Sequence, residues 1–332
     1  MTKTYQLVGI GNAVVDVISQ CDDSFLDHMG IEKGIMQLIE RDRSEVLFAA
    51  MKDRVQTPGG SVANTIAGAG ALGLTSAFIG RVHDDAIGRF YASAMQDEGV
   101  DFVNAPVAGG ELPTSRTMIF VSPDGERSMN TYLGISSEVS SDDVPNEVAG
   151  QAQIMFLEGY LFDKDKGKTA FMEAARDCKA GGGKPGIAIS DPFCVERHRA
   201  DFLKLIESEL DFVIGNEAEI KSLFETDDLE EALQKTSAIC PLVVCTRSGD
   251  GVTVVSEEGR IDIPVTKVVP VDATGAGDQF AAGFLFGLAS GRDLATCARI
   301  GNTCAAEVIS HIGPRPKTDM RSLLQAQGLI NA

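Results

Sequence analysis

The chain has 332 residues, 44% of them hydrophobic, and a formal net charge of −19 from 48 acidic and 29 basic side chains. This composition excludes a disordered chain, and no run approaches the roughly 18 apolar residues that would predict a membrane span. Nucleic acid is excluded as a partner, because no cluster of Lys and Arg offers the basic face that displaces counterions from a phosphate backbone.

The N-terminal residues and the cysteines indicate a cytoplasmic protein. Residues 5–10 form an apolar run typical of a buried strand, and no basic leader with an apolar core precedes them. The seven cysteines are dispersed, without a CxxC pair and without histidines at the spacing of a zinc site. We therefore expect reduced thiols in a cytoplasmic environment.

The first 140 residues contain short strand-like segments that predict a small sheet. The turn PDGE at residues 123–126 separates two of them and indicates a hairpin. A helical segment at residues 60–74 interrupts the series and belongs with the rest of the chain. The predicted strands are residues 14–18, 34–39, 101–107, 114–122 and 127–133. We expect a small β lid made of residues 13–45 and 99–138.

The rest of the chain alternates buried strands with amphipathic helices. Short apolar runs bounded by polar residues or glycine lie at residues 154–157, 186–189, 212–214 and 242–245. Helical patterns lie between and beside them, at residues 168–179, 199–209, 217–224 and 229–237. This alternation is typical of a mostly parallel sheet with helices on both faces. We assign residues 1–12, 46–98 and 139–332 to this large α/β domain.

The most informative motif is VDATGAGDQF at residues 271–280. It follows a β-rich stretch, residues 261–271, and opens a helix whose apolar face repeats every four residues. Gly275 and Gly277 allow a tight turn whose backbone N–H groups point at an anion, and the helix N-terminus adds its dipole. Asp278, in the first helical turn, could then take a proton from an attacking hydroxyl. The alternative is that Asp278 only stabilises the helix N-terminus.

Two earlier segments carry polar groups suited to a ligand with hydroxyls. Residues 59–64, GGSVAN, combine glycines that allow close backbone approach with Asn64, whose amide both donates and accepts. Residues 11–16, GNAVVD, place Asp16 within an apolar strand run, where a carboxylate is costly unless it binds a ligand. The simpler interpretations are a helix-capping loop for the first segment and a solvent-facing strand residue for the second.

Together these motifs resemble the signatures of the ribokinase, or PfkB, family of carbohydrate and nucleoside kinases, and the resemblance extends over nearly the whole chain. It implies a ribokinase-like fold and a catalytic role for Asp278 as the general base. It also implies an anion hole made by the backbone amides of Gly275, Ala276 and Gly277. The residues that would hold sugar hydroxyls are Asn12, Asp16, Gly59, Gly60 and Asn64.

Further segments resemble the nucleotide-binding part of the same family and imply ATP as the phosphoryl donor. Within NEAE, residues 216–219, Glu219 would position Mg²⁺ on the phosphates, partly through water, and carboxylates suit this metal. Relatives in the family also imply a monovalent cation such as K⁺ near Asp272. The residues that would contact the nucleotide are Asn216, Thr246, Gly249, Thr274 and Asn302.

Three motifs resemble the adenosine kinase branch of the family. They are RSMN at residues 127–130 after the hairpin turn, EGY at 158–160 after a buried strand, and DPF at 191–193 at the next strand end. In that branch Arg127 would approach the transferred phosphate as a charge-assisted partner. The residues that would enclose a purine ring are Met129, Tyr160 and Phe193.

The sequence departs from the adenosine kinase pattern in several places. Leu161 stands where that branch often presents an aromatic residue, and residues 313–316, GPRP, match only loosely. Ser61 is not the lysine common in ribokinases, which argues against ribose. Inosine, guanosine and free sugars therefore stay open as alternatives to adenosine.

Two functions of other classes compete with a kinase. A dinucleotide-dependent dehydrogenase could use Gly9 and Gly11, but Val14 stands where the third glycine is required. A non-catalytic nucleoside sensor could share the fold, but the presence of both Asp278 and Arg127 favours an enzyme. We predict an ATP-dependent kinase that phosphorylates the 5′-hydroxyl of a nucleoside, adenosine first, and that acts as a monomer or homodimer.

Overall fold

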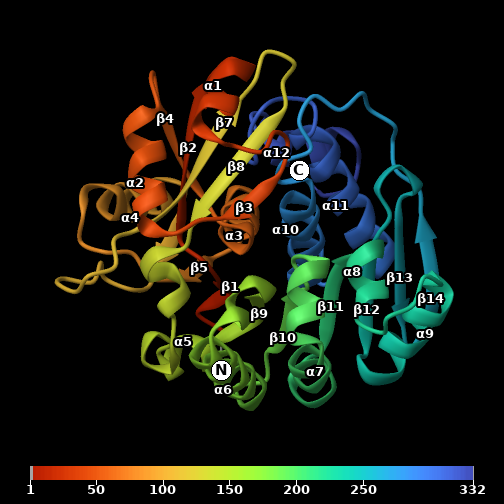
Figure 1. Cartoon of the computed structure of the whole chain (residues 1–332). Helices are drawn as coiled ribbons and strands as arrows, with labels where there is room; N and C mark the ends of the chain where they lie inside the picture. Colours follow the sequence, from red (N-terminus) through yellow and green to blue (C-terminus); the bar gives the residue numbers. More distant parts are fainter. Residues whose placement is uncertain (1–2, 332) are drawn as a thin grey trace.

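The computed structural model describes residues 3–331, which form two β-sheets with helices packed around them (Figure 1). The larger sheet has the strand order β14-β13-β12-β11-β10-β9-β1-β5-β6. Its pairs are parallel except for β12 with β13 and β13 with β14. The strands are β1 (Tyr5–Ile10), β5 (Ser76–Ile79), β6 (Val100–Phe102), β9 (Ala152–Glu158), β10 (Lys184–Ala188), β11 (Phe212–Asn216), β12 (Leu242–Thr246), β13 (Val252–Ser256) and β14 (Gly259–Ile263).

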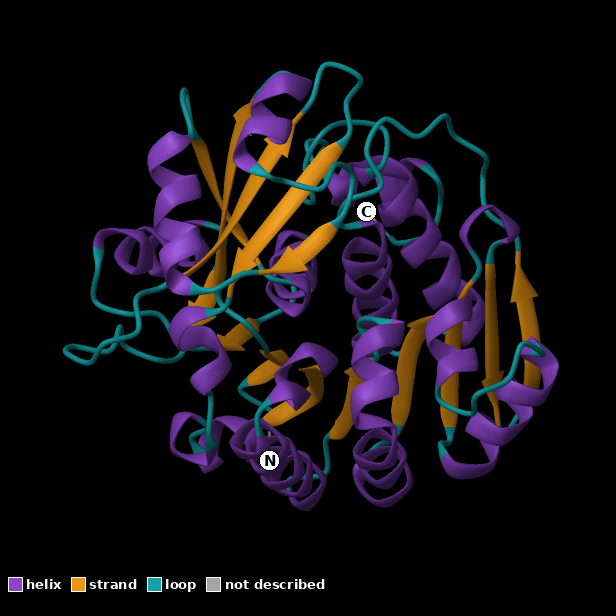
Figure 2. Cartoon of the chain, viewed as in Figure 1, coloured by secondary structure: helices purple, strands orange, loops and turns teal. Residues whose placement is uncertain are grey.

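Helices cover both faces of this sheet, as Figure 2 shows, so the predicted α/β class is confirmed. One face carries α5 (Asn146–Gly150), α6 (Asp165–Ala180), α7 (Pro192–Glu209), α8 (Glu217–Ser222) and α9 (Leu229–Ile239). The other face carries α3 (Ser61–Ala71), α4 (Ala86–Asp97), α10 (Ala276–Ala289), α11 (Leu294–Val308) and α12 (Met320–Ala326). Within residues 3–331, no helix combines the length and the apolar character needed to cross a membrane.

The smaller sheet has the strand order β3-β8-β7-β2-β4. Its strands are β2 (Val14–Gln20), β3 (Met36–Leu38), β4 (Val55–Gly59), β7 (Ser115–Val121) and β8 (Arg127–Tyr132). The helices α1 (Asp23–Met29) and α2 (Arg41–Ala50) lie beside it, and their Leu26 and Leu47 are buried in the same core as Met118 and Phe120 of β7.

Two strands lie in a different sheet from the one that the sequence predicts. β4 falls within residues 46–98, yet it pairs with β2 in the small sheet. Its sequence VQTPG lacks an apolar alternation, and its proline is tolerated because the strand lies at the sheet edge. β6 falls within residues 99–138, yet it pairs in parallel with β5 in the large sheet. It follows α4 directly, as the return strand of a β-α-β crossover does.

The β-rich stretch before the main motif is shorter than predicted. Strand β14 ends at Ile263, and a loop visible in Figure 2 connects it to α10. Pro264 and Pro270 cannot donate to a strand ladder, which explains the early end. Val269 in this loop is 87% exposed.

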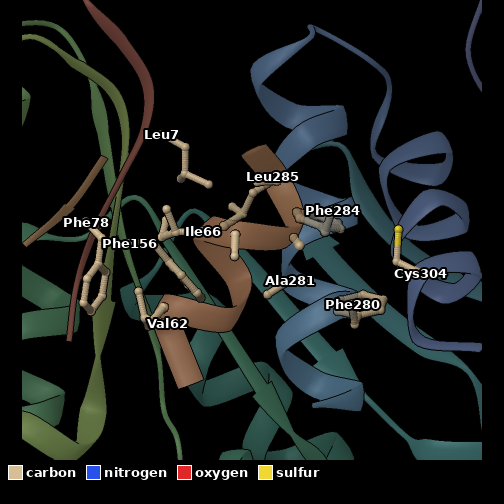
Figure 3. Close-up of a cluster of buried hydrophobic side chains, with 14 of the residues drawn as sticks. Leu7, Val62, Ile66, Phe78, Phe156, Phe280, Ala281, Phe284, Leu285 and Cys304 are labelled. Atoms are coloured by element: carbon tan, nitrogen blue, oxygen red, sulfur yellow. The ribbon is translucent and has the colours of Figure 1, made fainter. Parts of the chain in front are cut away.

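Helix α3 packs against α10 on one face of the large sheet, and both helices contact its strands (Figure 3). A Cβ added to Gly9 of β1 would lie 2.5 Å from Ile66 on α3, and one added to Gly68 would lie 2.9 Å from Ala282 on α10. Neither position accommodates a larger side chain, so both contacts depend on glycine. The packing of α3 on α10 brings the N-termini of the two helices together at the edge where the parallel strands end.

All seven cysteines are free thiols, and six of them are buried.

Candidate active site

The N-terminus of α10 carries the predicted catalytic carboxylate. Gly275 caps the helix with φ of 79°, a left-handed conformation that glycine adopts without strain, and Ala276 begins the helix. A Cβ added to Gly277 would meet no other atom, so the backbone there is open to a ligand. Asp278 accepts hydrogen bonds from Ser61 Oγ at 2.8 Å and Asn64 Nδ2 at 2.9 Å. One helix end thus presents both an open turn and an oriented carboxylate.

The surroundings of Asp278 change its acidity. Burial raises the pKa of its carboxyl to about 6, and the hydrogen bonds from Asn64 and Ser61 oppose that shift. A carboxylate with this pKa is mostly ionised at neutral pH, yet it is more basic than an exposed Asp. Asp278 is therefore suited to accept a proton at neutral pH.

A second buried carboxylate, Asp16, comes from β2 of the small sheet and is 8% exposed. Burial raises the pKa of Asp16 to about 6, whereas the charges of Arg127 and Arg315 favour its ionised form. The charge of Asp278 is also close enough to raise the pKa of Asp16. A Cβ added to Gly59 would lie 2.6 Å from Asp16 Oδ2, so glycine is needed where β4 passes this carboxylate.

Glu158, at the carboxyl end of β9, is a site residue that the sequence does not single out. It is 1% exposed, and its Oε1 accepts hydrogen bonds from the Asn12 backbone N–H at 3.1 Å and Nδ2 at 2.7 Å. Its Oε2 accepts from the Val62 N–H at 3.0 Å, and burial raises the pKa of Glu158 to about 7. A Cβ on Gly60, where φ is 98°, would lie 2.2 Å from Asn12 O. Glu158 thus joins the two predicted sugar-binding segments. The sequence shows it as a carboxylate that ends an apolar run and opens the EGY motif, without indicating this role.

Arg127 has a partner that the sequence does not predict. It begins β8, and its Nη1 donates to Asp272 Oδ2 at 2.6 Å in an ion pair that is largely buried. Burial favours the neutral acid, but hydrogen bonds from Thr274 and Gly313 hold the pKa of Asp272 below its usual value. Among the described residues, Arg127 Nε and Nη2 have no partner and are buried. The guanidinium therefore links the small sheet to the loop before α10 and keeps two free donors.

Two expected contacts involve the loop before α10: a monovalent cation near Asp272, and the nucleotide near Asn302. Both oxygens of Asp272 already accept hydrogen bonds from within the chain, so the residues present do not fit direct ligation of K⁺ by this carboxylate. Asn302 lies on α11. Its Nδ2 donates to Pro264 O at 3.3 Å, which places Asn302 beside the loop.

The residues expected to hold ATP and Mg²⁺ lie at the ends of β11 and β12. Asn216 pairs with Thr246 across these strands, and Gly249 follows in a short 3₁₀ helix. Glu219 accepts hydrogen bonds from Asn216 N and Nδ2, at 2.9 and 2.6 Å, and burial raises the pKa of Glu219 to about 7. Within residues 3–331, no group of three or more His, Cys, Asp or Glu side chains could hold a metal. Both oxygens of Glu219 accept hydrogen bonds from Asn216, so a contact of this carboxylate with Mg²⁺ would run through water.

The three residues expected to enclose a purine come from separate elements. Tyr160, in the 3₁₀ helix Gly159–Asp163, donates its hydroxyl to Ser190 O at 3.2 Å. Met129 is half-buried on β8 of the small sheet. Phe193 lies in the first turn of α7 and is 68% exposed.

Residues 313–315 follow α11 and contact the site directly, although they lie far from its other residues in the sequence. A Cβ added to Gly275 would lie 2.6 Å from Pro314 Cα, so this segment packs directly on the turn before α10. Arg315 Nε donates to Asn64 Oδ1 at 3.2 Å, across 251 residues of sequence. The sequence shows this segment only as a loose match to a family pattern.

The arrangement combines an anion-binding helix N-terminus, a carboxylate able to accept a proton, and a second buried carboxylate nearby. Backbone N–H groups at the start of α10 can hold phosphate oxygens, and Asp278 lies in the same helical turn. The charge of Asp278 raises the pKa of Asp16, so the two carboxylates share one electrostatic environment. These features suit phosphoryl transfer to a hydroxyl.

Comparisons with known proteins agree with this chemistry. A profile of the pfkB family carbohydrate kinases matches residues 31–320. A fructokinase from Klebsiella pneumoniae is 31% identical over 71% of this chain and 78% of its own length. The crystal structure of a probable sugar kinase protein from Rhizobium etli CFN 42 has a TM-score of 0.91 and 39% identity, covering 99% of this chain and 100% of that chain.

The crystal structure of an adenosine kinase from Sinorhizobium meliloti is similar to the same extent. Its TM-score is 0.90 with 43% identity, and the match covers 98% of this chain and 99% of that chain. Sugar and nucleoside kinases are therefore both among the similar proteins, and the matches extend over nearly the whole chain. The protein is a kinase, and the chain belongs to the PfkB family of carbohydrate kinases.

Proposed function

We propose that this PfkB-family kinase transfers the γ-phosphoryl group of ATP to the 5′-hydroxyl of a nucleoside, with adenosine as preferred acceptor and AMP as product. The observation that carries the reaction is the orientation of Asp278 by Ser61 and Asn64 beside the open turn at Gly277. This arrangement sets a base next to an anion site, which is what transfer of a phosphoryl group to a hydroxyl requires.

In the proposed reaction the acceptor oxygen attacks the γ-phosphorus while the bond from that phosphorus to the bridging oxygen of ADP breaks. Asp278 takes the hydroxyl proton, and the backbone N–H groups at Gly275, Ala276 and Gly277 hold phosphate oxygens. The unpartnered N–H groups of Arg127 would stabilise charge on the transferred group. Kinases of this family typically use Mg²⁺ with ATP, and the metal would neutralise phosphate charge near Glu219.

The choice of a nucleoside rests on the side chains around the acceptor position. Phe193 follows β10 at the carboxyl edge of the sheet and is 68% exposed. A purine stacked on this ring would bury apolar area on both partners, at roughly 25 cal/mol per Å². A free sugar would leave Phe193 and the half-buried Met129 uncovered. The similarity to the adenosine kinase of Sinorhizobium meliloti supports the same choice.

We also propose that the small sheet is a lid over the large domain. Residues 13–45 and 99–138 would supply most of it, joined by β4, and residues 1–12, 46–98 and 139–332 would supply most of the large domain. Support comes from Arg127 on β8, which reaches Asp272 in front of α10. Closure of such a lid excludes water that would otherwise hydrolyse ATP.

A second candidate is a sugar kinase, because several similar proteins carry the names sugar kinase or fructokinase. Coupled-assay rates with ATP and Mg²⁺ on adenosine, inosine, guanosine, ribose and fructose separate the two. We expect the highest kcat/KM with adenosine and, in Asp278→Asn, a kcat lower by at least about 10²-fold. A higher kcat/KM with ribose or fructose would show that the acceptor proposal is wrong and that the sugar kinase holds.

A further inference from the structure

We propose that Arg315 is a positioning residue of this active site, which fixes the side-chain amide of Asn64 so that its NH₂ group faces Asp278. The proposal rests on the proposed function, in which Asp278 is the base. It adds a residue that controls the base without touching either substrate.

The orientation of the Asn64 amide follows from the chemistry of its two neighbours. Arg315 Nε donates to Asn64 Oδ1 at 3.2 Å, and Asn64 Nδ2 donates to Asp278 Oδ2 at 2.9 Å. A guanidinium has only donors, and a carboxylate has only acceptors. One orientation of the amide satisfies both neighbours, and the flipped amide would oppose donor to donor and oxygen to oxygen. Arg315 therefore decides which end of Asn64 the base meets.

Arg315 is itself held in place on several sides. Its Nη1 forms an ion pair with Glu98, which follows α4, and its Nη2 lies 3.7 Å from Met95 Sδ. Pro314 and Pro316 flank it and restrict the backbone at both neighbours. Burial lowers the pKa of Arg315, but a guanidinium stays charged at any physiological pH. Arg315 therefore presents only donors to Asn64 at every pH at which the protein is folded.

Other titratable groups also face Asp278. The charge of Asp278 raises the pKa values of Asp16 on β2, Glu158 on β9, Glu219 on α8 and Tyr160 in the 3₁₀ helix after β9. Of these, only Asp16 shows an influence of the Arg315 charge. The fall of kcat at low pH, its acid limb, reports groups that titrate in the enzyme–substrate complex. An effect of Arg315 on acceptor binding through Asp16 would appear in KM instead.

The first test compares pH profiles of Arg315→Met, Arg315→Lys and the wild type with the acceptor that the wild type uses best. Without Arg315 the amide is free to turn its oxygen toward Asp278, so the acid limb of kcat should move up by about one pH unit, the effect of one hydrogen bond to a charged group. Arg315→Lys keeps a donor and a charge and should move the limb less. Arg321→Met is the matched control, because Arg321 Nη1 donates to Leu72 O at 2.9 Å, just after α3, away from Asn64. Its acid limb should stay at the wild-type pH.

A second readout does not depend on activity. The carboxyl ¹³C resonance of Asp278, assigned by its loss in Asp278→Asn, should titrate at higher pH in Arg315→Met than in the wild type. The shift should disappear when both proteins carry Asn64→Ala, because Arg315 acts through that amide. The two proposals can fail separately. If Asp278 titrates at higher pH in Arg315→Met but the wild-type protein phosphorylates none of the acceptors, the positioning role is supported and the proposed function is contradicted.

The positioning role is overturned if Asp278 titrates at the wild-type pH in Arg315→Met, or if the shift persists in the Asn64→Ala background. Arg315→Ala replaces Arg315→Met if the latter does not fold. Its methyl side chain has no donor, so it does not enforce the amide orientation. An unchanged titration of Asp278 in folded Arg315→Ala overturns the proposal equally.

Discussion

At the scale of single residues, Asp278 depends on two donors from α3, and a neutral substitution tests its assignment as the base. Asp278→Asn keeps the shape of the side chain but cannot accept the hydroxyl proton, so kcat should fall by at least about 10²-fold. ATP binding should change little, because the backbone N–H groups of Gly275 and Gly277 are unaffected. Steady-state kinetics and ATP titration calorimetry measure the two quantities, and near-normal turnover would contradict the assignment.

The pH dependence of the reaction follows from the same residue. Burial raises the pKa of Asp278 to about 6, and the base works only when ionised, so kcat should rise with pH through about 6 and then level off. Ser61→Ala removes a hydrogen bond that favours the ionised form and should move this limb to higher pH.

Thr65→Val is the control for that substitution. Thr65 Oγ1 donates to the backbone oxygen of Asp278 and not to its carboxylate. The acid limb should therefore remain where it is in the wild type. Equal shifts in the two variants would mean that Asp278 is not the group that titrates.

At the scale of secondary structure elements, the strands buried on both faces could be predicted, because every position in a run such as residues 212–214 is apolar. β4 could not, since only two of its five residues are buried and one of those is a proline. Motifs contained in one turn, such as residues 275–278, were also predictable. Arg315 was not, because its partner Asn64 lies on another helix, 251 residues away in the sequence.

The turn into α3 offers a test of backbone geometry. Gly60 has φ of 98°, and a Cβ there would lie 2.2 Å from Asn12 O, so Gly60→Ala must displace one of the two segments expected to hold sugar hydroxyls. We expect KM for the acceptor to rise at least about tenfold, with a stability loss on the order of 1–3 kcal/mol from backbone strain. Acceptor kinetics and urea denaturation measure the two effects.

Gly70→Ala, in the same helix, is the matched control for Gly60→Ala. Its Cβ would meet no atom closer than 3.6 Å, and alanine in a helix interior is more favourable than glycine by about 1 kcal/mol. KM should be unchanged and stability equal or higher. A similar KM increase in both variants would show that α3 as a whole, and not the turn at Gly60, affects acceptor binding.

At the scale of the whole molecule, Arg127 connects the small sheet to the large domain. Arg127→Ala should lower kcat more than it raises KM for the acceptor, because its charge is most needed as the phosphoryl group is transferred. Lys33→Ala is the control, since Lys33 pairs with Asp23 and Asp124 away from the site. A raised KM with unchanged kcat in Arg127→Ala would place this side chain at the acceptor instead.

Stability should also depend on pH through the four buried carboxyls of the site. Burial raises the pKa values of Asp16 and Asp278 to about 6 and those of Glu158 and Glu219 to about 7. The unfolded chain ionises near pH 4, so it loses these protons before the folded protein does. The free energy of unfolding should therefore fall as the pH rises from about 4 to about 7.

Urea denaturation of the ligand-free protein at pH 5 and pH 7.5 measures this difference. Glu158→Gln cannot ionise, so its unfolding free energy should fall less between the two pH values than that of the wild type. An equal fall in both proteins would mean that Glu158 does not carry the raised pKa.

The docking of α3 on α10 also determines when the enzyme becomes active during its synthesis. Ser61 and Asp278 are 217 residues apart, and at about 5–20 residues per second a ribosome needs roughly 10–40 s to travel from one to the other. During that interval the face of α3 that α10 will cover stays bare on the nascent chain. We expect stalled chains that end before α10 to bind chaperones, and expect no such chain to transfer a phosphoryl group. A translation product that ends before α10 therefore cannot consume ATP at this site.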